Sequence, residues 1–232
     1  MKINLKSIAL MGVALTMSMG MNARTIINGV NDDTPEYFTS PSKSAATCDA
    51  DGFIRRWTLL DPISKPNRGN TVFTDSYLRE NLAQHEYFPN QFTCDPKDGD
   101  KVTVEQQELT WRKLESTRFN VKLFRFAKKF EKEVYGVIFW AYTVIDCPNE
   151  IKDVRMAVGS NSGSMWWLNG EEALILSGDR RMVMDDGTSV RLTLKKGRNI
   201  IRGAVINGPG MSDFCVRFID EQGKPVTGYK VL

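Results

Sequence analysis

The alternation of hydrophobic and polar positions predicts short β-strands over most of this chain. Residues 119–126 alternate cleanly, which is typical of a strand with one buried face. Residues 135–145 form the most hydrophobic stretch after the first residues and predict a central strand covered on both faces. Turn sequences such as Asp186-Gly187 and Lys196-Gly197 separate the later strands. Many short strands with regular turns predict an all-β fold, an antiparallel β-sandwich of the jelly-roll kind.

One segment departs from this pattern and predicts a short helix near residues 75–86. Tyr77, Leu78 and Leu82 keep the spacing of one helix face. Thr74, Asp75 and Ser76 stand at the start of this segment, and residues of these types accept hydrogen bonds from the first free N–H groups of a helix. We therefore expect one short helix inside an otherwise all-β domain.

Residues 165–170, Met-Trp-Trp-Leu-Asn-Gly, predict a buried strand that ends in a tight turn. Asn169-Gly170 favours a type I′ hairpin turn because both residue types tolerate the positive φ that this turn requires. Successive side chains of a strand point to opposite faces, so Trp166 and Trp167 must diverge. We expect one of them in the core and the other exposed or covering a separate feature.

The first 47 residues differ in composition from the rest of the chain, and this difference predicts the domain organisation. Residues 1–23 resemble a signal peptide, with Lys2 and Lys6 before an apolar run that is too short to span a bilayer. No Cys stands at the cleavage point, so we expect a secreted or periplasmic protein without a lipid anchor or a membrane span in the mature chain. Residues 24–47 are polar and predict an extended leader, and residues 48–232 predict a single sandwich domain.

Composition narrows the possible functions. A chain of 232 residues with 41% hydrophobic residues is long enough to bury one sizeable core. Removing Lys2 and Lys6 with the signal peptide lowers the formal net charge from +3 to +1. Nucleic-acid binding depends on clustered Lys and Arg, so a nearly neutral mature chain argues against that class of partner.

The four cysteines predict disulfides, because an exported protein folds in an oxidising compartment. We pair Cys48 with Cys94 and Cys147 with Cys215, and the alternative is that these thiols are free and buried. No C-x-x-C pair or histidine cluster suggests a metal site. No phosphate-binding loop or cofactor motif is present either, so we expect no metal and no cofactor.

Several motifs in the second half of the chain carry a family resemblance. Residues 158–171 contain Trp-Leu-Asn-Gly, residues 192–199 contain Leu-Lys-Lys-Gly-Arg-Asn, and residues 216–225 end in Asp-Glu-Gln-Gly-Lys-Pro. These segments resemble the galactose-binding-like jelly-roll domains attached to secreted glycoside hydrolases and esterases. Residues 53–57, 62–68 and 208–214 are similar to secreted proteins of gut Bacteroidetes that are called acetylxylan esterases. The resemblance covers residues 47–232 and implies the fold, while one such fold serves many functions.

The resemblance also suggests where a sugar would bind. Trp167 takes the position of the structural Trp before Asn-Gly, so Trp166 must face the other way and could offer its ring to a sugar. Relatives that bind sugar through calcium carry paired Asp in the preceding loop, where this chain has Asn161-Ser162, so we expect no calcium there. The predicted carbohydrate-binding residues are Trp166, Asn161, Arg180, Arg181 and Asn207.

Catalytic motifs are sparse. His85 is the single histidine and therefore the only candidate base for a Ser-His-Asp hydrolase. Gly159 to Gly163 is no G-x-S-x-G elbow, because Asn161 occupies its centre. A glycoside hydrolase needs a pair of carboxylates that meet in space. The candidates near the Trp-Trp strand are Glu171, Glu172, Asp179, Asp185, Asp186 and Asp213.

Three functions are therefore compatible with the sequence. The preferred hypothesis is a secreted non-catalytic β-sandwich protein that binds polysaccharide, or assists its processing, with a plant or host glycan as partner. The first alternative is a carbohydrate esterase with His85 as its base, motivated by the resemblance. The second is a protein-interaction domain that partners a catalytic protein such as a glycoside hydrolase.

Overall fold

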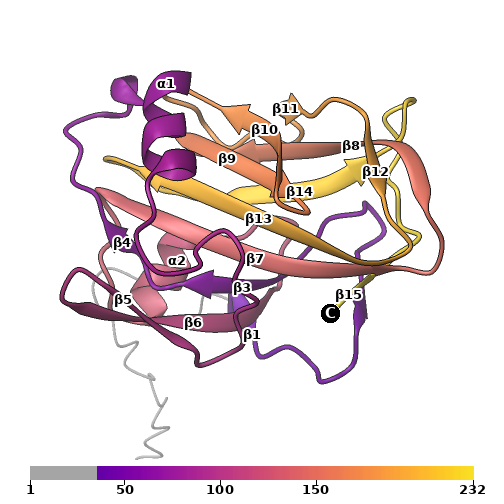
Figure 1. Ribbon diagram of the computed structural model, residues 1–232, viewed down its shortest axis with the longest axis horizontal. Helices are drawn as coiled ribbons and strands as arrows, with labels where there is room; N and C mark the ends of the chain where they lie inside the picture. Colours follow the sequence, from indigo (N-terminus) through magenta and orange to yellow (C-terminus); the bar gives the residue numbers. More distant parts are fainter. Residues whose placement is uncertain (1–35) are drawn as a thin grey trace, which may run out of the picture. The chain divides into compact units, whose positions relative to one another are not determined.

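The computed structural model describes residues 36–232, which form two antiparallel sheets packed as a β-sandwich (Figure 1). This confirms the predicted all-β class. The larger sheet has 11 strands, and its main path runs in the order β1-β6-β3-β7-β13-β9-β10. These strands are β1 (Phe38–Thr39), β6 (Gln107–Ser116), β3 (Arg56–Leu60), β7 (Val137–Cys147), β13 (Gly197–Asn207), β9 (Gly163–Leu168) and β10 (Glu171–Leu176). The predicted signal peptide, residues 1–23, lies outside the described residues.

Shorter strands complete both sheets. In the large sheet, β15 (Lys230–Val231) pairs with β2 (Ala46–Thr47) and β7, β4 (Ile63–Ser64) pairs with β7, and β5 (Lys101–Val104) pairs with β6. The small sheet of 4 strands is centred on β8 (Ile151–Ser160), which pairs with β11 (Gly187–Thr188), β12 (Leu192–Leu194) and β14 (Phe214–Ile219). Strands β1 and β2 lie in the segment predicted as a leader, so the domain begins earlier than residue 48.

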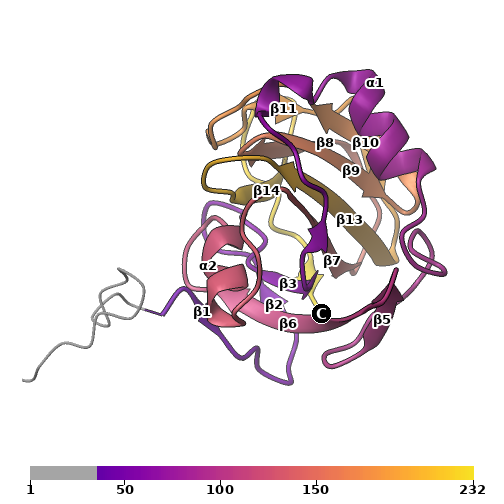
Figure 2. The same ribbon diagram turned by 90° about the vertical axis from the view of Figure 1, so that its left-hand side faces the viewer.

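The predicted helix is present and lies against the large sheet (Figure 2). It consists of α1 (Asp75–Leu78) and a π-helical turn, η2 (Arg79–Gln84), and a 3₁₀ turn, η1 (Asn70–Val72), precedes it. The Thr74 hydroxyl accepts a hydrogen bond from the Tyr77 N–H at 3.3 Å, which confirms the predicted N-cap. Leu78 and Leu82, on the side of the helix that faces the sheet, are fully buried. Within residues 36–232, no helix is long and apolar enough to cross a bilayer.

A second helix, α2 (Leu123–Lys129), replaces the strand predicted over residues 119–126, so that local prediction is wrong. Leu123, Phe126 and Ala127 have helical spacing, and all three are fully buried. The Phe126 ring packs against Phe38 and Phe139 at 6.5 Å, so α2 closes one side of the sandwich core. A short apolar run is compatible with the repeat of a helix and with that of a strand, and tertiary packing selects the helix here.

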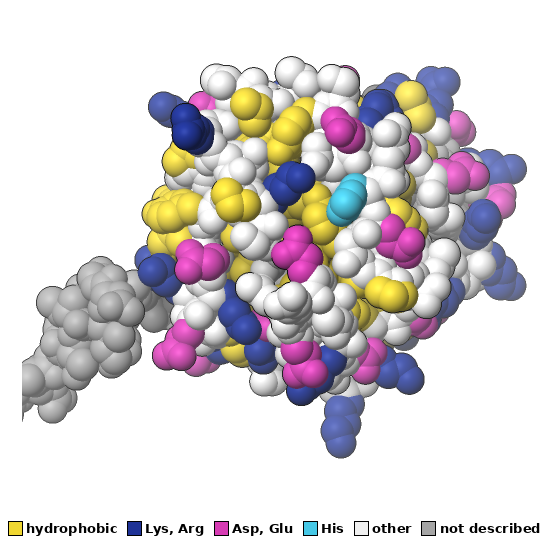
Figure 3. Space-filling view, turned by 60° about the vertical axis from the view of Figure 1, so that its left-hand side comes forward, with side chains coloured by type: hydrophobic (Ala, Val, Ile, Leu, Met, Phe, Trp, Pro, Cys, Tyr) yellow, Lys and Arg dark blue, Asp and Glu magenta, His cyan; other side chains and the backbone are white. Residues whose placement is uncertain are grey.

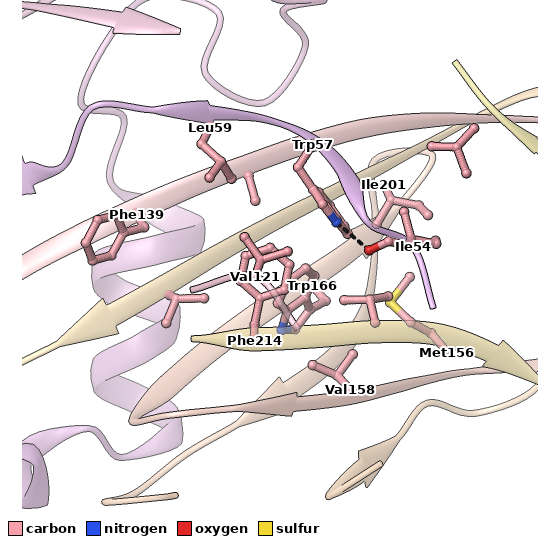
Figure 4. Packing of buried hydrophobic residues seen from close by; sticks show 14 of the residues in the cluster. Ile54, Trp57, Leu59, Val121, Phe139, Met156, Val158, Trp166, Ile201 and Phe214 are labelled. Atoms are coloured by element: carbon pink, nitrogen blue, oxygen red, sulfur yellow. Dashed lines mark hydrogen bonds between the residues drawn. The ribbon is translucent and has the colours of Figure 1, made fainter. Parts of the chain in front are cut away.

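The large sheet is covered on both faces, which explains why both tryptophans of β9 are buried. On the face toward the small sheet, Trp166 packs against Trp57 at 6.0 Å and Phe214 at 5.0 Å (Figure 4). On the opposite face, Trp167 stacks on Trp140 at 5.8 Å. Trp166 and Trp167 have exposed fractions of 0% and 7%. Their divergence is confirmed, but the prediction that Trp166 is exposed is wrong because its face of the sheet meets the second sheet.

The hairpin turn after β9 has the predicted geometry, and its Asn169 hydrogen-bonds to the Leu-Lys-Lys-Gly-Arg-Asn motif and to the residue after it. Asn169 and Gly170 have φ values of 53° and 89°, as a type I′ turn requires. The Asn169 amide donates to the Asn199 side-chain oxygen at 3.0 Å, and its own oxygen accepts from the Ile200 N–H at 2.9 Å. These bonds fix the start of β13 beside the end of β9.

All four cysteines are free thiols, so both predicted disulfides are wrong. Cys48 belongs to the core between the sheets, whereas Cys94 packs on the opposite face of the large sheet. Cys147 also lies in the core between the sheets, whereas Cys215 alternates with core residues of β14 and contacts Met182 at 3.9 Å. A sheet therefore separates the members of each predicted pair. Burial raises the pKa of all four thiols, that of Cys215 to about 11.

Candidate functional site

The face of the large sheet that carries α1 and η2 changes from apolar to polar along its strands. One row across the sheet is apolar and consists of Trp111, Leu60, Trp140, Ala204, Met165 and Ile175. The next row on the same face lies two residues along each strand, or three on β10, where a bulge shifts the register, and consists of Lys113, Thr58, Tyr142, Arg202, Trp167 and Glu172. Thr58, Tyr142 and Arg202 in this row have exposed fractions of 5%, 4% and 6%, so their polar groups need partners from the protein or from a ligand.

A long connection, residues 85–100, crosses this face and is called the strap below. Its first half is held by aromatic contacts, Phe88 on Trp111 at 6.1 Å and Phe92 on Trp140 at 5.9 Å. Its last residues hydrogen-bond to β6, because the Trp111 N–H donates to the Asp100 carbonyl at 2.8 Å. The strap covers the apolar row and leaves part of the polar row open.

Three side chains hold the middle of the strap on the polar row and are called the clamp: Asp95, Tyr142 and Arg198. The Tyr142 hydroxyl donates to one oxygen of the Asp95 carboxylate, and Arg198 pairs with the other at 2.6 Å. Arg198 also donates to the Tyr142 hydroxyl oxygen at 2.8 Å. The guanidinium of Arg202 lies 5.1 Å from the centre of the Tyr142 ring and donates to the Cys94 carbonyl. The clamp thus joins β7, β13 and the strap through charge-assisted hydrogen bonds.

The protonation of the clamp follows from these contacts. Burial and the hydrogen bond to Asp95 both raise the pKa of Tyr142. Partial burial alone would raise the pKa of Asp95, but the hydrogen bonds from Tyr142 and Arg198 outweigh it and lower that pKa below its ordinary value. At neutral pH Tyr142 is therefore a neutral donor and Asp95 a carboxylate. A neutral tyrosine is a poor nucleophile, and its hydroxyl serves here as a hydrogen-bond donor.

A cleft of about 290 Å³ opens beside the clamp on the polar row. Its wall includes Arg56, Asp95, Asp98, Lys113, Tyr142 and Arg198, which come from β3, β6, β7, β13 and the strap. Arg56 is fixed by an ion pair with Glu115 at 2.9 Å. Lys97 and Lys113 also line the cleft and take part in no ion pair between residues 36–232. The cleft therefore combines fixed donors and acceptors with lysines free to meet a ligand.

The carbohydrate-binding residues predicted from sequence do not form one surface around Trp166. The Trp166 ring is fully buried, so it is no platform for a sugar. Asn207 is also fully buried, and its amide donates to the Val134 and Gly210 carbonyls, so the prediction of a ligand contact there is wrong. Arg180 pairs with Asp186 at 2.5 Å. Asn161 is half-buried and Arg181 is exposed, and a ligand contact at these two residues stays a prediction.

The candidate catalytic residues are placed for other roles. His85, the single histidine, is exposed at the start of the strap and packs on the Tyr87 ring at 4.3 Å (Figure 3). Four of the candidate carboxylates are paired with cations within the fold. These pairs are Glu172 with Arg79, Asp185 with Arg217, Asp186 with Arg180, and Asp213 with Lys122. In the described part of the chain, no three metal-ligating side chains come together.

The sequence carried only a partial signal for the cleft. Arg198 and Arg202 are four residues apart on β13 and therefore on the same face, so two charges on one face of a central strand could have marked a polar site. Asp95 has no comparable signal, because its role depends on how the irregular strap crosses the sheet. Tyr142 stands in the most hydrophobic strand and gives no sign of its hydrogen bonds.

Comparisons with known proteins give no family assignment. No protein-family model matches the chain, and no curated protein matches it. Similar solved structures include a PA14 sugar-binding domain from an RTX adhesin, with 10% identity, a TM-score of 0.43, and coverage of 76% of this chain and 96% of that one. Another is the PA14 domain of the MpAFP antifreeze protein, with 10% identity, a TM-score of 0.43, and coverage of 83% and 94%.

Proposed function

We propose that this chain is a secreted, non-catalytic β-sandwich protein that binds polysaccharide, a plant or host glycan, in the cleft beside the clamp. The observation that carries the proposal is the clamp itself. Tyr142 and Arg198 hold the Asp95 carboxylate at the edge of an open cleft, so hydrogen-bonding groups are fixed before a ligand arrives. Preorganised polar groups reduce the ordering cost of binding and give it specificity.

The chemistry of the cleft suits sugar hydroxyls. Asp95 and Asp98 supply carboxylate acceptors, and Lys113 and Arg198 supply donors, within one cleft of about 290 Å³. That volume lies near the lower end of the range for small-molecule sites, as expected for one or two sugar residues. Lys97 and Lys113 could additionally meet a carboxylate or sulfate on an acidic glycan. The proposal gives this chain no catalytic step, so another protein would cleave the bound glycan.

Binding to immobilised and soluble glycans tests this function. We expect affinity electrophoresis and calorimetry to detect binding to at least one of xylan, polygalacturonate and heparin. Lys113→Ala should weaken that binding because it removes a donor from the cleft. Lys152→Ala is the matched control, since Lys152 lies on β8 of the small sheet and pairs with Glu150 at 3.2 Å.

Two outcomes would count against the proposal. The first is the absence of binding to every glycan in the panel. The second is equal affinity of the Lys113→Ala variant and the unmodified protein. If Arg181→Ala weakens binding while Lys113→Ala does not, the ligand lies on the loops predicted from sequence and the cleft is the wrong site.

A further inference from the structure

A second hollow borders the strap. Its volume is about 220 Å³, and Cys94, Asp95, Pro96, Lys101, Val102 and Trp111 are part of its wall. It is called the outer hollow below. Asp95 and Pro96 also line the cleft beside the clamp, so the two hollows meet at this point of the strap.

Both hollows combine charged and apolar side chains. In the cleft, Lys97, Asp98 and Lys113 lie beside Trp57, Pro96 and Val144. In the outer hollow, Asp100 and Lys101 lie beside Pro96, Val102 and Trp111. A sugar residue has both kinds of surface, because its C–H groups pack on apolar side chains while its hydroxyls hydrogen-bond. Each hollow can therefore receive a sugar residue, and Asp95 stands between them.

We propose that the cleft and the outer hollow are successive subsites of one groove, so that the ligand is a chain of linked sugar residues. This inference rests on the proposed function and adds the length of the ligand and a second set of contacts. The chain would cross the strap at Asp95 and Pro96. The Asp95 carboxylate, held by Tyr142 and Arg198, would be shared by the sugar residues on either side.

Cys94 provides a way to test the outer hollow alone. It lines that hollow and is half-buried, whereas Cys48, Cys147 and Cys215 have exposed fractions of 8%, 1% and 0%. Burial raises the pKa of the Cys94 thiol, so alkylation should be carried out at mildly alkaline pH. A bulky maleimide at Cys94 would fill the outer hollow and leave the cleft open.

The experiment compares a disaccharide with longer oligosaccharides of xylan and of polygalacturonate, each measured by calorimetry. We expect the longer ligands to bind roughly tenfold more tightly than the disaccharide. Alkylation of Cys94 should remove this gain and leave disaccharide affinity unchanged. A Cys94→Ser protein carried through the same treatment should keep the gain. Lys101→Ala should also lower affinity for the longer ligands alone.

The possible failures are distinguishable. If Lys113→Ala weakens binding but neither alkylation nor Lys101→Ala changes affinity for longer ligands, the outer hollow is no subsite and the proposed function stands. If Lys113→Ala changes nothing or no glycan binds, the proposed function fails and this inference fails with it. Equal affinity for the disaccharide and the longer ligands also overturns the inference.

Discussion

Gly203 and Trp166 lie opposite each other on the neighbouring strands β13 and β9, and the indole ring occupies the space that a side chain at residue 203 would need. A Cβ atom added to Gly203 would stand 2.3 Å from Cζ3 of that ring. The absence of a side chain lets Trp166 lie flat against the large sheet and reach Trp57 and Phe214 (Figure 4).

Gly203→Ala should destabilise the protein because the added methyl group overlaps a buried ring that has no free space to move into. Overpacking of this kind costs about 1–3 kcal/mol. Urea unfolding measures the loss, and Gly69→Ala is the control because nothing lies within 4 Å of a Cβ at that position. Equal stability of the two variants would show that Trp166 packs elsewhere.

Trp166→Ala should lower the free energy of unfolding by about 3–5 kcal/mol, because it leaves a large cavity between the two sheets. This is a substantial part of the stability of an ordinary domain. Thermal and urea unfolding measure the change, with Arg181→Ala as an exposed control on the loop after β10. A Trp166→Ala protein that melts at the original temperature would contradict the burial of this ring.

Tyr142→Phe should loosen the strap, because it removes the hydroxyl that donates to Asp95 and accepts from Arg198. We expect a loss of about 0.5–1.5 kcal/mol, at the low end because the Asp95 side chain is 59% exposed and stays paired with Arg198. We expect lower stability and faster alkylation of Cys94. Tyr135→Phe is the control, since Tyr135 is 52% exposed. Identical alkylation rates in both variants would mean that the clamp does not hold the strap.

The contribution of Asp95 to stability should depend on pH. Its pKa in the folded protein lies below the ordinary value of 3.8, so its stabilising contacts are fully present above that value. They are lost as the pH falls through the folded pKa. The unmodified protein should therefore exceed Asp95→Asn in stability at neutral pH, and the difference should shrink as the pH falls below 3.8. Urea midpoints at a series of pH values measure it, and a constant difference would contradict the assignment.

His85→Ala should change neither glycan binding nor stability, because the imidazole is exposed and its ring contact is with Tyr87 at the surface. We also expect no acetate release from acetylated xylan. Release that disappears in His85→Ala would instead establish the esterase activity that the family resemblance suggested.

Local physics made several features predictable from sequence. Asn169-Gly170 tolerates positive φ, and the turn forms there. Thr74 can cap a helix, and it does. The alternation of side chains along β9 required Trp166 and Trp167 to diverge, and they do. Each of these features depends on residues close together in the chain, so the residue types alone are sufficient.

Only the tertiary structure decided which faces are covered and which side chains meet. Trp166 is buried because the small sheet packs on its face, and residues 123–129 form a helix because three apolar side chains reach the core that way. The clamp joins Asp95, Tyr142 and Arg198 from distant parts of the chain, and no local pattern records that meeting. The sequence determined most of the strands, the turns and the class of the fold, whereas the candidate site arises from packing between elements that are remote in sequence.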